Sequence, residues 1–382
     1  MGPLAGIKVI EMAGIGPGPM TAMMLSDMGA DVLRIERQSD AGLGIRRPEK
    51  YDLLLRGRKA LALDLKNKNS VAVVLDLINR SDALIEGFRP GVMERLGLGP
   101  DVCLERNSKL VFGRMTGWGQ HGPLAQAAGH DLNYIALTGA LNAIGRKGQL
   151  PAPPLNLLGD YAGGAAYLAF GMVCAMMEAR RSGKGQVVDA AIVDGTAHLM
   201  TSLFGMHGAG MLKPGRGENI VDSGAFFYDT YECADGKLIS IAPLESKFYN
   251  DLLQRLGLGA AELPAQSDAA RWPEGRSVLA DLIQTKSRDE WCALLEGTDV
   301  CFAPVLTLAE APQHPHMKAR ETFIEVGGAV QPAPAPRFSR TPPGQPTPPR
   351  KAENTPLAEA LDGWMSGPEI EALRATGLTI QS

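Results

Sequence analysis

Residues 1–115 alternate short aliphatic segments with helical segments, and this alternation limits the folds that are open to the chain. The aliphatic segments have the length of buried strands, and they are residues 7–12, 31–36, 61–65, 82–86 and 110–115. Helices are expected between them at residues 20–28 and 70–78. Strands that alternate with helices favour a parallel sheet with helices on both faces. The sequence therefore predicts an α/β fold built on a doubly wound parallel sheet.

The centre of the chain is rich in glycine and alanine, and we expect two helices there, at residues 133–143 and 160–180. The second helix contains the longest weakly apolar run, residues 161–177, which starts beside Asp160 and ends at Glu178. A run of this length with many small residues fits a buried helix better than a membrane span. We therefore expect no membrane association.

A second, smaller α+β domain is expected at about residues 223–318. Two β-rich segments, residues 226–233 and 238–242, flank an Asp-Gly turn at residues 235–236, which is typical of a hairpin. Helices are expected after the hairpin at residues 246–256 and 288–295.

Composition excludes several classes of function. The formal net charge is −4 at pH 7, so the chain as a whole does not attract nucleic acid or an anionic membrane. The five cysteines include no C-x-x-C pair and the histidines are scattered, so neither a disulfide framework nor a metal site is expected. Residues 1–10 lack the pattern of a secretory signal. We expect a protein of the reducing cytoplasm.

The loop at residues 14–19 follows a strand and opens a helix, as a dinucleotide-binding loop does. However, Pro17 and Pro19 remove two N–H donors from the turn that would hold a pyrophosphate. A close strand-to-helix turn is the better interpretation of this loop.

Basic residues outnumber acidic ones between residues 46 and 68. The cluster consists of Arg46, Arg47, Lys50, Arg56, Arg58, Lys59, Lys66 and Lys68. Arg34, Arg37 and Arg89 end or follow neighbouring strands, which is where open α/β sheets bind ligands. A solvated face is the usual explanation of a charge run, but the position at strand ends favours a small anionic ligand with several phosphates.

Three ionisable residues stand out by their context. His130 starts a helix, Asp160 precedes the Gly163-Gly164 helix, and Glu245 follows the second strand of the hairpin. Each also has an ordinary structural explanation: a core histidine, a helix cap and a surface acid. Spacing alone does not decide between the two.

Taken together in order, these segments resemble the α-methylacyl-CoA racemase branch of the family III CoA-transferase fold. The motifs that carry the resemblance are residues 4–7 (LAGI), 16–19 (GPGP), 63–66 (LDLK), 88–92 (FRPGV), 129–134 (GHDLNY), 154–160 (PLNLLGD), 183–190 (GKGQVVDA) and 244–245 (LE). They span nearly the whole chain.

The resemblance implies a domain arrangement. Residues 1–190 and 336–382 would form a large Rossmann-like CoA-binding domain, and residues 223–318 the small α+β domain. Residues 191–222 and 319–335 would be linkers. Members of this family form interlocked homodimers, in which each active site takes its large domain from one subunit and its small domain from the other.

The resemblance also implies which residues bind CoA, which is part of the thioester substrate, so that no separate cofactor is expected. Residues for the nucleotide end and the phosphates would be Arg37, Leu63, Asp64, Leu65, Lys66 and Arg89. Residues that border the thioester would be Gly129, His130, Asp131, Leu132, Asn133 and Tyr134. Leu132 stands where isoleucine is common, and the loop at residues 38–55 departs from the family in length and sequence.

The reaction implied is interconversion of (2R)- and (2S)-2-methylacyl-CoA by 1,1-proton transfer, which belongs to fatty acid metabolism. It needs a base on each face of the α-carbon and a donor to the enolate oxygen. His130, paired with Glu245, would serve one face and Asp160 the other. Amides at the start of the Asp160 helix would donate to the enolate.

Other functions stay open at this point. In a family III CoA-transferase, Asp160 would be a nucleophile that moves CoA between carboxylic acids. Transferases of this family generally lack the histidine of the Gly-His-Asp motif, which favours the racemase. A non-catalytic CoA- or nucleotide-binding protein would need only the basic cluster, and a dehydrogenase would have to bind NAD.

Overall fold

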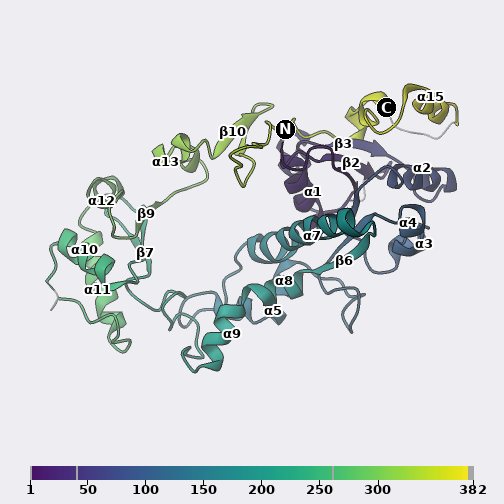
Figure 1. Cartoon of the computed structure of the whole chain (residues 1–382). Coiled ribbons are helices and arrows are strands. Elements are labelled where there is room, and N and C mark those ends of the chain that lie inside the picture. The colour runs from purple at the N-terminus through teal and green to yellow at the C-terminus, as the bar shows by residue number, and fades with distance from the viewer. Residues whose placement is uncertain (1, 40–41, 260–261, 377–382) are drawn as a thin grey trace. The chain divides into compact units, whose positions relative to one another are not determined.

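A six-stranded parallel sheet forms the centre of the first of two compact units. The computed structural model describes residues 2–39, 42–259 and 262–376. The strands are β1 (Lys8–Met12), β2 (Asp31–Glu36), β3 (Lys59–Ala62), β4 (Ala83–Glu86), β5 (Val111–Thr116) and β6 (Gln186–Ala191). Their spatial order is β3-β2-β1-β4-β5-β6, so the direction of winding reverses between β1 and β4. Figure 1 labels β2, β3 and β6 of this sheet. The prediction of a doubly wound parallel sheet is confirmed.

Helices cover both faces of this sheet. Successive side chains of each strand point to opposite faces, and the side chains on both faces are apolar. The helices of the unit are α1 (Pro17–Asp27), α2 (Lys68–Ile78), α3 (Val92–Arg95), α4 (Pro100–Arg106), α5 (Asp131–Leu137), the π-helix η3 (Leu157–Ala166), α7 (Tyr167–Ser182) and α8 (Ile192–Leu199). Ile10 on β1 packs in one core with α2 and α4, whereas Val9 packs in the other with α1 and α7. Strands buried on both faces are expected of a parallel sheet.

The continuous helix Leu157–Ser182, which joins η3 and α7, is long and apolar enough to cross a membrane by length and composition. Half of its most apolar window is buried inside the protein. Leu168, Met172 and Met176 of α7 lie in the core against the sheet, as we expect for the core helix of a globular domain.

The C-terminal part of the chain returns to the first unit. A hairpin of β10 (Phe323–Val326) and β11 (Ala329–Pro332) comes first, and α14 (Leu357–Ala360) and α15 (Gly367–Ala375) follow. Trp364, between the two helices, is buried in the core with β1 and β2.

The second unit comprises Gly139–Pro154 and Thr201–Arg320. Its antiparallel sheet consists of β7 (Asp229–Glu232), β8 (Leu238–Ile241) and β9 (Phe302–Val305). Its helices are α6 (Ala140–Ala143), α9 (Thr201–Gly208), α10 (Ser246–Leu256), α11 (Trp272–Ile283), α12 (Arg288–Leu295) and α13 (Pro315–Ala319). The predicted hairpin forms with its turn at residues 235–236, but the third strand and α11 were not predicted.

Three segments group differently from the expected domain boundaries. Residues 139–154 belong to the second unit, where Arg146 pairs with buried Asp229 at 2.7 Å. Residues 191–200, expected in a linker, include α8, which packs in the first unit. Residues 321–335, also expected in a linker, belong to the first unit as well.

Three predicted elements differ from the structure. The third strand is Lys59–Ala62 rather than residues 61–65, because Leu63 already leaves the strand. The helix expected at residues 133–143 is broken by Gly139, whose φ of 85° ends α5 and starts α6. The helix expected at residues 160–180 begins earlier, as a π-helix.

Two arginines of the basic cluster are buried and paired, so they are not part of an open anionic site. Arg56 donates to Asp27 at 2.6 Å and to Gln331 at 2.9 Å, which ties β11 to α1. Arg58 donates to Glu11 at 2.7 Å and to the carbonyl of Pro19 at 3.0 Å. Both guanidinium groups stabilise the fold, since Arg56 links α1 to β11 and Arg58 links β1 to α1.

We expect Arg58→Met to lower the free energy of unfolding by about 3–5 kcal/mol, because it leaves the Glu11 carboxylate buried without its main partner. The double variant Glu11→Gln/Arg58→Met should recover much of this loss, since no buried charge is then left alone. Urea unfolding measures both.

The matched control is Lys59→Met, since Lys59 forms a half-exposed pair with Asp31 at 3.6 Å. A surface pair of this kind contributes about 0–1 kcal/mol. Equal losses in Arg58→Met and Lys59→Met would contradict a special role of the buried pair.

Candidate active site

A cavity of about 980 Å³ opens at the carboxyl edge of the parallel sheet, within the first unit. The residues that line it come from the loop after β1, the ends of β2 and β3, the start of α5, the π-helix and the returning C-terminal segment. The position fits the rule that open α/β sheets bind ligands outside the carboxyl ends of their strands. His130 and Asp160, 30 residues apart in the chain, both line this cavity.

His130 stands immediately before α5 and is held by the first turn of that helix. Its backbone is extended, with φ of −132°, and its N–H donates to the Asn133 side chain at 3.1 Å. Its carbonyl accepts from the backbone N–H of Asn133 at 2.7 Å. These bonds fix the backbone of His130 while its side chain stays exposed.

The aromatic side chains of Tyr134 and Trp118 support the loop before His130. The Tyr134 hydroxyl donates to the carbonyl of Gly129, and the Tyr134 ring meets Trp118 edge-on at 4.7 Å between centroids. A Cβ at Gly129 would lie 2.7 Å from the Tyr134 ring, so the close contact requires glycine. Burial raises the pKa of Tyr134, so the hydroxyl keeps its proton.

Asp160 lies in the first part of a π-helix, a rare form that is frequent at functional sites. Glycines allow this helix to approach its neighbours closely. A Cβ at Gly163 would lie 2.4 Å from Thr196 Oγ1 on α8, and a Cβ at Gly164 would lie 3.1 Å from Pro17 on α1. The Gly-Gly motif therefore allows the Asp160 helix to pack closely against α8 and against the first turn of α1.

Gly16 completes the surroundings of the Asp160 carboxylate. Its φ is 66° with ψ of −121°, a conformation that only glycine adopts readily. A Cβ there would lie 3.2 Å from Asp160 Oδ2. The loop after β1 is thus a close strand-to-helix turn, as predicted, and it also forms one wall of the cavity.

The carboxylate of Asp131 lies next to Asp160 and binds its backbone. The N–H of Asp160 donates to Asp131 Oδ1 at 2.6 Å, and Asp131 Oδ2 is buried without a hydrogen-bond partner among the described residues. Burial raises the pKa of Asp131. Burial also raises the pKa of Asp160; Asn156, which donates to Oδ2 at 3.4 Å, opposes the rise, and the charge of Asp131 adds to it. A carboxyl group with a raised pKa suits proton transfer near neutral pH.

A buried ion cluster holds the loop at residues 87–91. Glu86 accepts from the N–H of Phe88 at 2.7 Å and from Arg114 at 2.9 Å, and Arg114 also pairs with Glu94 at 2.8 Å. The Arg37 guanidinium lies over the Phe88 ring, 5.9 Å from its centroid. The cluster therefore fixes the strand end from which Arg89 projects and supports Arg37 beside the cavity.

The residues expected to bind CoA are only partly brought together. Arg37 and His130 line the cavity, whereas Leu63 is buried and Ala62 takes its place in the lining. The remaining expected residues lie outside the described lining of the cavity: Asp64, Leu65, Lys66, Arg89, Gly129, Asp131, Leu132, Asn133 and Tyr134. Their contacts with CoA stay a prediction.

Glu245 belongs to the second unit, where it precedes α10 directly after β8. Its side chain is exposed, and its carbonyl accepts from the backbone N–H of Phe248 and Tyr249 at 3.0 Å. Its pairing with His130 stays a prediction.

Sequence analysis missed several cavity residues. Asn156 and Tyr161 line it beside Asp160, and Lys351 reaches it from the C-terminal segment. Asn156 could have been found, because it precedes Asp160 by four residues in a helical segment and so shares its face. The sequence around Lys351 contains no feature that indicates a binding site.

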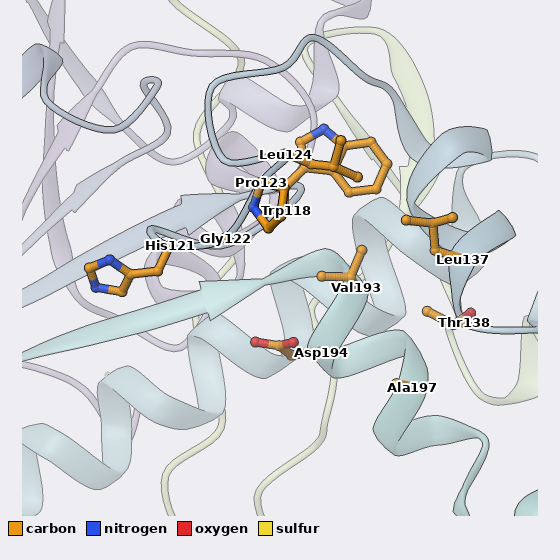
Figure 2. A pocket seen from close by; sticks show the side chains of 10 residues that line it. All are labelled: Trp118, His121, Gly122, Pro123, Leu124, Leu137, Thr138, Val193, Asp194 and Ala197. Atoms are coloured by element: carbon orange, nitrogen blue, oxygen red, sulfur yellow. The ribbon is translucent and has the colours of Figure 1, made fainter.

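A second cavity, of about 320 Å³, lies between the loop after β5 and helices α5 and α8. Figure 2 shows Trp118, Pro123 and Leu124 on one side, and Val193 and Asp194 of α8 on the other. It contains no residue that was predicted for the site. Among the described residues, no cluster of three His, Cys, Asp or Glu side chains is arranged to hold a metal ion.

Comparison with known proteins agrees with this architecture. Residues 4–357 match CoA-transferase family III. The chain is 46% identical to the alpha-methylacyl-CoA racemase of Mus musculus over 340 residues, which cover 89% of this chain and 87% of that protein. It is 44% identical to the alpha-methylacyl-CoA racemase of Homo sapiens over 342 residues, with the same coverage.

Among solved structures, the chain is similar to Rv3272 of Mycobacterium tuberculosis, with a TM-score of 0.74 and 26% identity. The likeness covers 92% of this chain and 97% of that one. The strand order, the helix-covered sheet and the extent of these matches agree: the chain belongs to CoA-transferase family III.

Proposed function

We propose that this protein is an isomerase that interconverts (2R)- and (2S)-2-methylacyl-CoA thioesters. The observation that carries the proposal is that one cavity holds both an exposed histidine and a carboxyl group of raised pKa, His130 and Asp160. Arg37 at the same cavity supplies positive charge for the phosphates of CoA. The names of the mouse and human relatives support the same activity.

In the proposed reaction, one of the two groups removes the proton from the α-carbon. The electrons of the C–H bond move into the thioester, so that an enolate with negative charge on oxygen forms. The other group then delivers a proton to the opposite face, and the enolate collapses to the thioester of inverted configuration. Neutral His130 acts as base when protonated Asp160 is the acid, and the roles exchange in the reverse direction.

The enolate oxygen needs a hydrogen-bond donor. We expected amides at the start of the Asp160 helix, but the N–H groups of Gly159 and Asp160 both bind the Asp131 carboxylate. These two amides therefore hold Asp131 instead of the enolate. The N–H groups of Asp131 and Leu132, directly after His130, are the candidates that remain in the proposal, since the N–H of Asn133 already donates to the His130 carbonyl.

We further propose that the protein works as an interlocked homodimer in the cytoplasm, with Glu245 of one subunit beside His130 of the other. Large apolar side chains on the helices of both units support an interface: Leu137 on α5 is 66% exposed, Phe170 on α7 71% and Phe204 on α9 57%. Large contiguous apolar patches on a surface mark protein–protein interaction sites. The five cysteines are all free, in keeping with a reducing compartment.

A CoA-transferase is the second candidate. The Asp160 carboxylate would attack the thioester carbonyl, form an acyl-aspartyl anhydride and release the CoA thiolate. Both reactions need ionised Asp160, the transferase as a nucleophile and the racemase as a base in one of its two directions, so the pKa that burial raises does not decide between them. The presence of His130 at the same cavity favours proton transfer.

A single stereoisomer of a 2-methylacyl-CoA, incubated with the protein in deuterated water, should take up deuterium at the α-carbon and lose its configuration. His130→Ala and Asp160→Asn should each slow this reaction by roughly 10²–10⁴-fold, because each removes a proton-transfer group. Mass spectrometry and chiral analysis follow the two events.

Asp101→Asn is the matched control, since Asp101 is an exposed acid on α4 outside the cavity. Absence of deuterium uptake, together with transfer of CoA to an added carboxylate, would replace the racemase by the transferase.

Asp131→Asn should shift the ionisation of Asp160 in the pH profile of racemisation to lower pH. The variant removes a negative charge that raises the pKa of Asp160, while its amide oxygen can still accept the Asp160 N–H. Asn156→Ala should shift the same ionisation to higher pH, because it removes a donor that lowers the pKa. Profiles of kcat/KM against pH for both variants test the assignment, and shifts in the same direction would contradict it.

A further inference from the structure

The side chain of Tyr161 lies at the candidate site, but the proton transfer between His130 and Asp160 does not use it. It is half-buried and lines the same cavity as those two residues. Within the part of the chain that the structure describes, no group forms a hydrogen bond with its hydroxyl. In contrast, the hydroxyl of Tyr167, on the same continuous helix, bonds to His198 at 2.6 Å. The Tyr161 hydroxyl is therefore available to a ligand in the cavity.

The π-helix explains why Tyr161 reaches the cavity. Its N–H donates to the carbonyl of Asn156, five residues earlier, at 3.3 Å, which is the bond that defines a π-helix. In an α-helix, with about 3.6 residues per turn, residues five apart lie far apart around the axis. The wider turn brings them onto one face, and Asn156, Asp160 and Tyr161 all line the cavity. The rare helix form thus places a hydroxyl group beside the carboxyl group.

Other hydrogen-bond donors around the carboxyl group are already engaged. The N–H of Asp160 donates to Asp131 at 2.6 Å, and the Asn156 side chain donates to Asp160 Oδ2 at 3.4 Å. The Tyr134 hydroxyl is bonded to a backbone carbonyl. Tyr161 differs from these groups because its hydroxyl has no such acceptor within the described residues.

We propose that the Tyr161 hydroxyl is a catalytic group that donates a hydrogen bond to the thioester oxygen and stabilises the enolate. The thioester carbonyl is bonded to the α-carbon, which lies between His130 and Asp160 in the proposed reaction, so its oxygen is formed beside the residue that follows Asp160. The hydroxyl keeps its proton throughout, while the α-proton moves only between the substrate and the other two groups. The inference rests on the proposed racemase and adds a side-chain donor to the backbone amides after His130.

Tyr161→Phe should lower kcat for racemisation by roughly 10²–10³-fold, as the loss of one donor to an oxyanion does. KM should stay close to that of the wild type, because the bond strengthens only as charge develops on the oxygen. The variant keeps the aromatic ring, so the shape of the cavity is retained. Tyr167→Phe is the matched control: it removes a hydroxyl group from the same continuous helix outside the cavity, and kcat should not change.

A titration tests the hydrogen bond without any turnover. The probe is acetoacetyl-CoA, a β-keto thioester whose enolate absorbs ultraviolet light. Tyr161→Phe should shift the ionisation of the bound probe to higher pH by about 1–2 units, the effect of one hydrogen bond to a charged group. Tyr167→Phe should leave the ionisation unchanged. A shift in Tyr161→Phe, in a protein that racemises no thioester, would keep this inference and reject the proposed function.

Two results would overturn the inference. One is that Tyr161→Phe keeps the wild-type kcat and the wild-type titration of the bound probe. The other is a higher KM with unchanged kcat and an unshifted titration, which would limit the hydroxyl to a contact with the unreacted substrate. Thermal unfolding midpoints of both variants are measured first, and kinetics and titration are carried out at a temperature at which both are folded.

Discussion

The close packing of the π-helix against α1 and α8 is the contact on which the candidate site depends. Gly163 meets Thr196, and the Gly195 position on α8 tolerates no Cβ, which would lie 1.8 Å from the carbonyl of Gly163. Because the helices approach this closely, the half-buried Asp160 carboxyl group lies beside the glycine loop after β1 at the wall of the cavity. Its burial there raises its pKa, so the same contact that closes the core also prepares the acid.

The first half of the sheet was predictable because its strands are short, apolar and separated by helices of regular period. Strand β6 was not predicted, since its residues 186–191 include Gln186 and Asp189 and are half exposed at the sheet edge. The π-helix was not predicted either, because it depends on glycine contacts with α8, which begins more than 25 residues later. Local sequence therefore predicts the strands well and tertiary contacts poorly.

The same limit applies to the charges of the candidate site. His130 and Asp160 were found by motif, but the sequence could not separate Arg37, which lines the cavity, from Arg58, which is buried against Glu11. Both arginines follow or precede strands in a basic stretch. Arg58 is buried because its ion-pair partner, Glu11, lies inside β1. Lys351 lines the cavity because the C-terminal segment returns to the sheet and bonds to Glu36 through Ala352.

The electrostatics of the cavity divide it into two chemically different ends. Near Asp160, burial raises the pKa of both Asp160 and Asp131, and the charge of Asp131 adds to the rise at Asp160. At the ends of β2 and β3, cations exceed the acids that remain unpaired, so phosphates are favoured. A thioester of CoA has the matching polarity, with an uncharged acyl carbon at one end and an anionic nucleotide at the other. In the proposed racemase, Asp160 exchanges a proton with the acyl carbon at one end of the cavity, while Arg37 at the other end faces the anionic nucleotide.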